Sequence, residues 1–183
     1  VMHLIVDIGN TNVVIGIFEQ EEWIYTWRLP THKEMMVSEY EIRIRQYFLE
    51  STIKISDITD VAISSVVPDL TSRIKEVCDK LFVFDSFLIT PNVIMKLGLG
   101  DVVRPNEIGS DLVANSVAAN ELFAKSAIIV DFGTALTFTS VSENGHINGV
   151  AISPGVKTAM KSLSSNTAKL PEIPLEIPQT AIG

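Results

Sequence analysis

The sequence has little cysteine, little histidine and no long apolar run. Cys78 is its one cysteine, so no disulfide can form within the chain, and a reducing, cytoplasmic location is expected. The three histidines lie apart from one another without cysteine or glutamate at ligand spacing, so a zinc site is not expected. No stretch of about 18 apolar residues and no basic-then-apolar leader is present, which argues against a membrane partner.

Positive charge is scarce as well. Lys and Arg number 14 against 22 Asp and Glu, giving a net charge of −8. Nucleic-acid binding needs a face rich in Lys and Arg, and the sequence has no cationic cluster, so DNA and RNA are not expected partners. At 183 residues and 46% hydrophobic, the chain can bury the core of one domain or two small ones.

The most informative feature is a repeated segment. Ile5–Thr11 reads Ile-Val-Asp-Ile-Gly-Asn-Thr, and Ile129–Thr134 reads Ile-Val-Asp-Phe-Gly-Thr. In each copy an apolar run predicts a buried strand, the glycine predicts a turn, and a second strand-like run follows, at Val13–Phe18 and Leu136–Val141. The separation of the copies predicts one per lobe of a two-lobed protein, with both facing a cleft.

Each turn has the chemistry of a phosphate site. Glycine at positions 9 and 133 lets main-chain N–H groups approach phosphate oxygens closely. Asp7 and Asp131 would repel a polyphosphate unless a cation lay between them, so the acids predict Mg²⁺ or a monovalent ion. Two ordinary hairpins left by an old duplication are the structural alternative.

The remaining pattern predicts an α/β protein with mixed sheets. In the first half we expect, in order, the strand Trp23–Leu29, the helix Glu39–Leu49, the strand Val61–Val67, the helix Thr71–Leu81 and the strand Phe82–Leu88. Three strands followed by alternating helix and strand is the order of a ribonuclease-H-like lobe. We assign residues 1–108 to this first lobe.

Residues 109–183 predict a linking helix and a partial second lobe. Strands are expected near Ala127–Asp131, Thr137–Ser142 and His146–Ile152, with a helix at about Lys157–Leu163. The later helix-strand units of the first lobe have no counterpart, so the second lobe is expected to lack its C-terminal part. Asp111 lies in the first turn of the linking helix, where an acid serves as a cap or as a catalytic group.

In these motifs the chain resembles type III pantothenate kinase, a member of the actin-like, sugar-kinase and chaperone-ATPase fold group. The segments that carry the resemblance are Asp7–Thr11, Ser64–Pro68, Pro105–Asp111 with Ala114-Asn115, Asp131–Ala135, Gly149–Gly155 and Thr167–Pro171. The resemblance implies phosphorylation of pantothenate by ATP to 4'-phosphopantothenate, the first step of coenzyme A biosynthesis. It also implies a homodimer, Mg²⁺, and K⁺ or NH₄⁺.

The resemblance implies roles for individual residues. It makes Asp111 the proton acceptor, Asp131 the ligand of the monovalent cation and Asp7 a ligand of Mg²⁺, directly or through water. The implied ATP contacts are Asp7, Ile8, Gly9, Asn10, Thr11, Asn12, Val13, Val14 and Thr134. The implied substrate contacts are Val102, Gly109, Ser110, Asp111 and Leu112.

Two of these positions depart from the family pattern. Leu112 stands where the family usually has arginine, which removes a cation that could bind the pantothenate carboxylate. Val102 stands where the family often has tyrosine, so the pocket is expected to be more apolar. Two alternatives follow: a kinase of another small hydroxylated metabolite, or a non-catalytic, nucleotide-binding regulatory relative.

Overall fold

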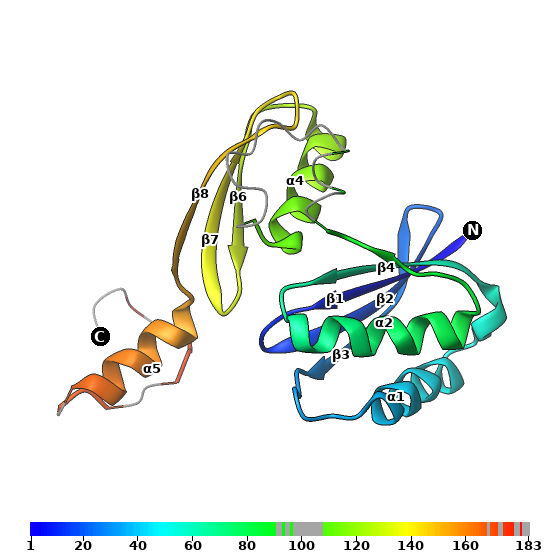
Figure 1. Ribbon diagram of the computed structural model, residues 1–183. Coiled ribbons are helices and arrows are strands. Elements are labelled where there is room, and N and C mark those ends of the chain that lie inside the picture. Colours follow the sequence, from blue (N-terminus) through cyan, green and yellow to red (C-terminus); the bar gives the residue numbers. More distant parts are fainter. Residues whose placement is uncertain are drawn as a thin grey trace.

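The computed structural model describes residues 1–90, 93, 96, 108–167, 169–171, 174–177 and 180. This part of the chain forms two sheets with helix α4 (Ser110–Phe123) between them (Figure 1). Helix α4 contacts β4 of the first sheet and both β6 and β7 of the second. The linking helix expected from the sequence is therefore the element that joins the two lobes.

The first lobe has five strands and two long helices on one face of its sheet (Figure 1). Its elements are β1 (Met2–Ile8), β2 (Asn12–Glu19), β3 (Glu22–Pro30), α1 (Val37–Glu50), the short 3-10 helix η1 (Ile55–Asp57), β4 (Ile58–Ser65), α2 (Pro68–Phe82) and β5 (Phe87–Leu88). The strand order is β3-β2-β1-β4-β5, with β1–β3 antiparallel and β4 and β5 parallel to β1. Along the chain, three strands are followed by alternating helices and strands, which is the order of elements that the sequence predicts.

Buried and exposed residues alternate along β1, and the buried ones show which face of the sheet packs against the hydrophobic core. Leu4, Val6 and Ile8 have no exposed area, whereas Asp7 between them is exposed. The buried residues pack with the apolar faces of the two helices, among them Ile44 of α1 and Ile74 of α2. The opposite face of β1, which carries Asp7, is therefore free to contribute to a site.

Cys78 lies on the buried face of α2 and has no exposed area. Burial in this apolar core raises the pKa of its thiol to about 12, so the thiolate is absent at neutral pH. The cysteine is a packing residue with no nucleophilic role, and it is not part of a disulfide.

The strand expected over residues 82–88 begins later than predicted. Residues 82–88 read as a strand, but α2 continues through Phe82, Val83 adopts a left-handed conformation (φ 59°), and β5 is limited to Phe87–Leu88. Leu81 and Phe82 are buried and continue the apolar stripe of α2, which keeps the chain helical for another turn.

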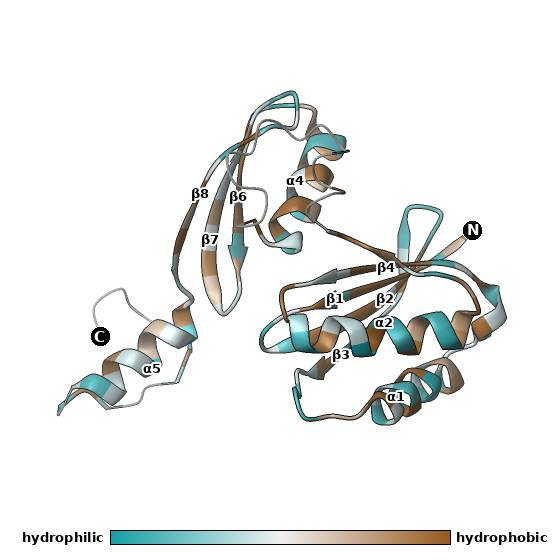
Figure 2. Ribbon diagram, viewed as in Figure 1, coloured by the Kyte–Doolittle hydropathy of each residue, from teal (hydrophilic) through white to brown (hydrophobic). Residues whose placement is uncertain are grey.

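The second lobe contains a three-stranded antiparallel sheet and one further helix. Its elements are β6 (Ala127–Phe132), β7 (Ala135–Val141), β8 (Ile147–Pro154) and α5 (Val156–Asn166), and the strand order is β6-β7-β8. The strands carry apolar residues much as those of the first lobe do (Figure 2). Ile128, Val130 and Phe132 of β6 are nevertheless 64%, 43% and 76% exposed. Among the described residues, no strand pairs with the outer edge of β6.

Candidate active site

The two repeated segments form tight strand-turn-strand units of similar geometry. In the first, the Gly9 N–H donates to the carbonyl oxygen of Asn12 at 2.9 Å. In the second, the Gly133 N–H donates to the carbonyl oxygen of Ala135 at 3.0 Å. A Cβ on either glycine would lie within 3.3 Å of these carbonyl oxygens, so both turns favour glycine because of close backbone approach.

The two turns meet although they lie far apart in the sequence. The hydroxyl oxygens of Thr11 and Thr134 are 2.7 Å apart, a hydrogen-bonding distance that joins one lobe to the other. Both residues are exposed, so their hydroxyls can be reached from solvent. The two turns expected from the sequence, one from each lobe, therefore lie against each other.

Asp7 lies at the centre of an acidic cluster. Its pKa is raised, first because neighbouring strands remove part of its hydration, and further because the carboxylates of Asp111 and Asp131 repel its charge. A hydrogen bond with the Ser64 hydroxyl and the positive charge of Arg28 act in the opposite direction and lower it. The three acids expected from the sequence to act together are thus close enough to interact.

Asp111 lies in the first turn of α4, as the sequence predicts. One of its carboxylate oxygens, Oδ1, accepts a hydrogen bond from the N–H of Leu112 at 2.8 Å. A Cβ added to Gly109, the residue before the helix, would overlap the same oxygen. Gly109 therefore leaves the space that the Asp111 carboxylate occupies.

The buried hydroxyl of Ser110 fixes the beginning of α4 against β4. It accepts a hydrogen bond from the Ser65 N–H at 2.8 Å and donates one to the Ser65 carbonyl oxygen at 2.9 Å. It also lies 3.1 Å from the hydroxyl oxygen of Ser64, which in turn bonds Asp7. A continuous polar path therefore connects Asp7 with the helix turn that holds Asp111.

Asp131 ends β6 on the opposite side of the cluster. The side-chain amide of Asn115 on α4 donates to its Oδ2 at 3.3 Å. The same two residues form the polar part of a pocket of about 420 Å³ between α4 and β6. The rest of this pocket is apolar and includes Leu122, Phe123 and Ile128.

The acidic cluster suits hard cations that arrive with a ligand. Within the described residues, no group of three or more His, Cys, Asp or Glu side chains is arranged to hold a metal ion by itself. Carboxylate and hydroxyl oxygens are nevertheless the ligands that Mg²⁺ and K⁺ prefer, and Mg²⁺ commonly binds through one or two carboxylates plus phosphates and water. The mutual repulsion at Asp7 is relieved by any cation placed among the three acids.

Several expected contact residues have side chains that point into the core. Ile8 and Val13 have no exposed area, and Ser110 and Leu112 are each 7% exposed. Contacts of these four residues with a ligand would therefore come from the main chain. Val102 lies outside the described residues.

Ser64 and Gly155 lie in segments that carry the family resemblance, but the sequence assigned neither residue a role in the site. Ser64 supports Asp7, and only its register position opposite Asp7 on the neighbouring strand reveals this. Gly155 precedes α5, and its N–H donates to the carbonyl oxygen of Thr134 at 3.0 Å. The hydroxyl of Thr158 donates to the same oxygen at 2.9 Å, so the beginning of α5 supports the second turn.

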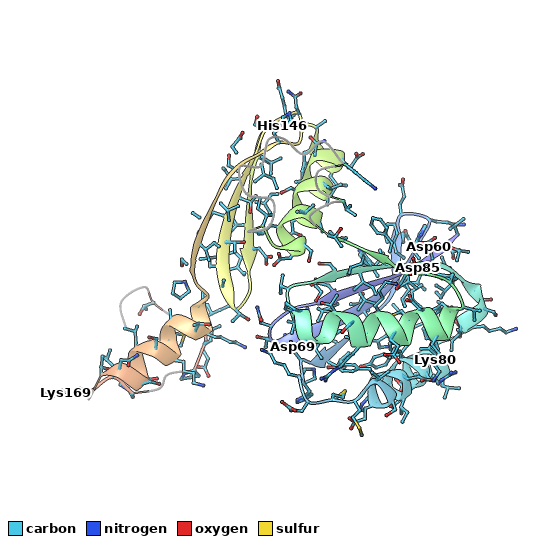
Figure 3. All side chains as sticks on the ribbon, viewed as in Figure 1. Asp60, Asp69, Lys80, Asp85, His146 and Lys169 are labelled. Carbon is cyan, nitrogen blue, oxygen red and sulfur yellow. The ribbon has the colours of Figure 1, made fainter. Side chains whose placement is uncertain are left out.

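His3 and His146 lie away from this site. His3 pairs with Asp60 at 2.6 Å on the first sheet, and His146 lies at the far tip of the second sheet, on the loop between β7 and β8 (Figure 3). In the part of the chain that is described, no helix is both long enough and apolar enough to span a bilayer.

A sequence model of the type III pantothenate kinase family matches residues 3–183. The chain is 36% identical over 183 residues to a type III pantothenate kinase of Halalkalibacterium halodurans, covering 100% of this chain and 71% of that protein. It is 38% identical over 181 residues to the enzyme of the same name from Finegoldia magna, covering 98% and 68%.

Solved structures support the fold alone. The Ppx/GppA phosphatase of Aquifex aeolicus matches 90% of this chain with a TM-score of 0.53 and 13% identity, and the chain spans 54% of that structure. The chain thus spans about half the length of this structure and about two thirds of the two pantothenate kinases. The expected α/β fold class is confirmed, and the first sheet is mixed as expected, whereas the second sheet, as far as it is described, is purely antiparallel.

We expect Asp7→Asn to raise the melting temperature of the nucleotide-free protein at neutral pH. The folded state raises the pKa of Asp7, so ionisation of this group costs stability at any pH above the folded-state pKa. The gain should shrink as the pH falls toward the ordinary value of 3.8, because Asp7 is then protonated in both states. Thermal unfolding across this pH range tests the claim, with Glu76→Gln as the charge-matched control, because Glu76 is exposed on α2 and makes no hydrogen bond or ion pair with any described residue. A lower melting temperature for Asp7→Asn at neutral pH contradicts it.

Gly155→Ala should destabilise the second turn, and Gly149→Ala should not. A Cβ at position 155 would overlap the backbone of Gly133 and Thr134, whereas one at position 149 meets nothing within 4 Å. We expect a loss of about 1–3 kcal/mol for Gly155→Ala, together with weaker ATP binding. Urea denaturation and nucleotide titration of both variants provide the measurement. Equal stability and equal ATP affinity in the two variants would show that the close approach of Gly155 to the backbone of the second turn is unimportant.

Proposed function

The chain belongs to the type III pantothenate kinase family, and from this premise we propose how its cleft carries out the ATP-dependent phosphorylation of pantothenate, the first step of coenzyme A biosynthesis. The observation that carries the proposal is the convergence of Asp7, Asp111 and Asp131 between two glycine turns, one from each lobe. We assign residues 1–108 to the first lobe and residues 109–183 to the linking helix and partial second lobe.

Residues 7–14 of the first turn and Thr134 of the second hold the triphosphate of ATP. Main-chain N–H groups of the turns and the hydroxyls of Thr11 and Thr134 are the donors available to phosphate oxygens. Asn10 and Asn12 add side-chain amides, while Ile8 and Val13 contribute through the backbone. The two turns thus act as opposite walls of one phosphate site.

Cations balance the charge of the acids and the phosphates. Asp7 would hold Mg²⁺, directly or through water, and Asp131 would hold K⁺ or NH₄⁺ with Asn115 supporting its carboxylate. When bound, these ions neutralise charge on the phosphates as the phosphoryl group moves. The raised pKa of Asp7 supports this assignment, since a bound cation would restore the ionised carboxylate.

Asp111 positions the acceptor hydroxyl and takes its proton. The hydroxyl oxygen forms a bond to the γ-phosphorus, the bond from that phosphorus to the bridging oxygen of ADP breaks, and the proton passes to the Asp111 carboxylate. A helix N-terminus favours the ionised carboxylate and weakens it as a base. This is tolerable because the proton leaves late in a loose phosphoryl-transfer transition state, so orientation matters more than basicity.

The acceptor lies along the beginning of α4. Gly109 to Leu112 would contact pantothenate mainly through the backbone, because the side chains of Ser110 and Leu112 are buried. Val102 is proposed as a further contact. Since buried Leu112 replaces the usual arginine, a kinase of another small hydroxylated metabolite is the second candidate. Turnover on a panel of hydroxyl acceptors would distinguish the two.

We assign the working enzyme to the cytoplasm as a homodimer. The free, buried Cys78 is in keeping with a reducing compartment. Leu122 and Phe123 at the end of α4 are 75% and 63% exposed, an apolar area that further protein would cover. Sedimentation of the full-length protein tests the dimer.

Asp111→Asn should abolish turnover while ATP binding is retained. Loss of the proton acceptor should lower kcat by about 10²- to 10⁴-fold. A coupled assay of ADP release in the presence of pantothenate and K⁺, with isothermal titration of ATP, measures both quantities on the full-length protein. Asp85→Asn removes the same charge outside the cleft and should behave as wild type. Unchanged turnover in Asp111→Asn would favour a non-catalytic, nucleotide-binding role.

Gly109→Ala should impair catalysis with little loss of stability. The new Cβ would displace the Asp111 carboxylate, a flexible side-chain end, and would meet Val66 only at 3.4 Å. We expect kcat to fall about 10- to 100-fold, because small errors in position are costly in a group-transfer site. The melting temperature and the ATP affinity should stay near wild type. A wild-type kcat would mean that Asp111 does not need its observed position.

A further inference from the structure

A row of four side-chain positions crosses the face of the first sheet that is opposite the helices. Asp7 of β1 pairs with Val14 of β2 on one side and with Ser64 of β4 on the other. Val14 in turn pairs with Arg28 of β3. Directly opposed residues in neighbouring strands project from the same face, so Arg28, Val14, Asp7 and Ser64 form one line across the cleft side of the sheet.

Arg28 is the basic residue whose positive charge acts on Asp7. Its side chain is exposed, and it makes no hydrogen bond or salt bridge with any residue that the structure describes. Its positive charge nevertheless acts on Asp7, opposing the repulsion from Asp111 and Asp131. A guanidinium with all its donors available therefore lies beside the acidic cluster.

The strand that carries Arg28 is tied to the first phosphate turn. The Thr31 hydroxyl donates to the carbonyl oxygen of Gly9 at 2.7 Å, and the Thr31 N–H donates to the carbonyl oxygen of Thr11 at 2.9 Å. Arg28, three residues earlier, is thereby held at a fixed place relative to this turn. The hydrogen bonds of Thr31 therefore fix the position of Arg28 relative to the backbone of the first glycine turn.

The geometry points to Arg28 as a phosphate-binding residue that contacts the nucleotide from the β3 side of Asp7. Ser64, Ser110 and Asp111 lie on the other side of Asp7, where the acceptor is proposed to bind. A guanidinium offers paired N–H donors that match two phosphate oxygens. It would supply the fixed positive charge that the three acids lack.

This inference rests on the proposed function and names a further residue of the same site. The test uses the full-length protein and compares Arg28→Gln and Arg28→Lys with wild type. The measurements are the Kd of Mg·ATP by isothermal titration and the KM of ATP and of pantothenate. Arg43→Gln is the matched control, because Arg43 is exposed on α1, which covers the opposite face of the sheet.

We expect Arg28→Gln to raise the Kd of Mg·ATP by about 10- to 100-fold and to leave the KM of pantothenate unchanged. Arg28→Lys should recover part of the affinity, since it keeps the charge but not the paired donors. Arg43→Gln should match wild type.

Three results would overturn the inference. Nucleotide affinity and both KM values at wild-type levels in Arg28→Gln would mean that this residue does not contact the ligand. A raised KM for pantothenate with unchanged ATP affinity would assign Arg28 to the acceptor carboxylate instead. Absence of ATP binding by the wild-type protein would refute the proposed function itself, and the inference with it.

Discussion

The buried hydroxyl of Ser110 is the contact on which the arrangement of the site depends. It bonds both the N–H and the carbonyl oxygen of Ser65, and it borders the hydroxyl of Ser64 that supports Asp7. Helix α4 also contacts β6 and β7, so this anchor orients the second lobe along with Asp111. One small side chain thereby sets the spacing between Asp111 at the beginning of α4 and Asp7 on β1.

Like charges are brought together in this site, because Asp7, Asp111 and Asp131 come from three different elements. Partial burial raises the pKa of Asp7, and repulsion from Asp111 and Asp131 raises it further. Such an arrangement costs stability, and any cation bound among these carboxylates would relieve the repulsion. The fold thus supplies the rigid framework and the negative charge of the site.

Local sequence was sufficient for the turns and for most elements. The two Asp-x-Gly segments predicted both hairpins, and the apolar periodicity predicted the succession of strands and helices along the first lobe and the position of Asp111 in the first turn of a helix. It was insufficient where a residue's role depends on a distant partner. Ser64 supports Asp7 from a neighbouring strand, and Arg28 reaches it across β2, so neither carries a local signal. The error at Phe82 has a similar origin, because burial against the sheet favours another helical turn over strand propensity.

The hydrogen bond between Thr11 and Thr134 joins the two lobes at the two glycine turns. One hydroxyl of the pair donates its proton and the other accepts it, so the accepting hydroxyl keeps its own proton free. That proton can be donated to a phosphate oxygen without breaking the bond between the threonines. A ligand at these turns can therefore be bound while this contact between the lobes persists.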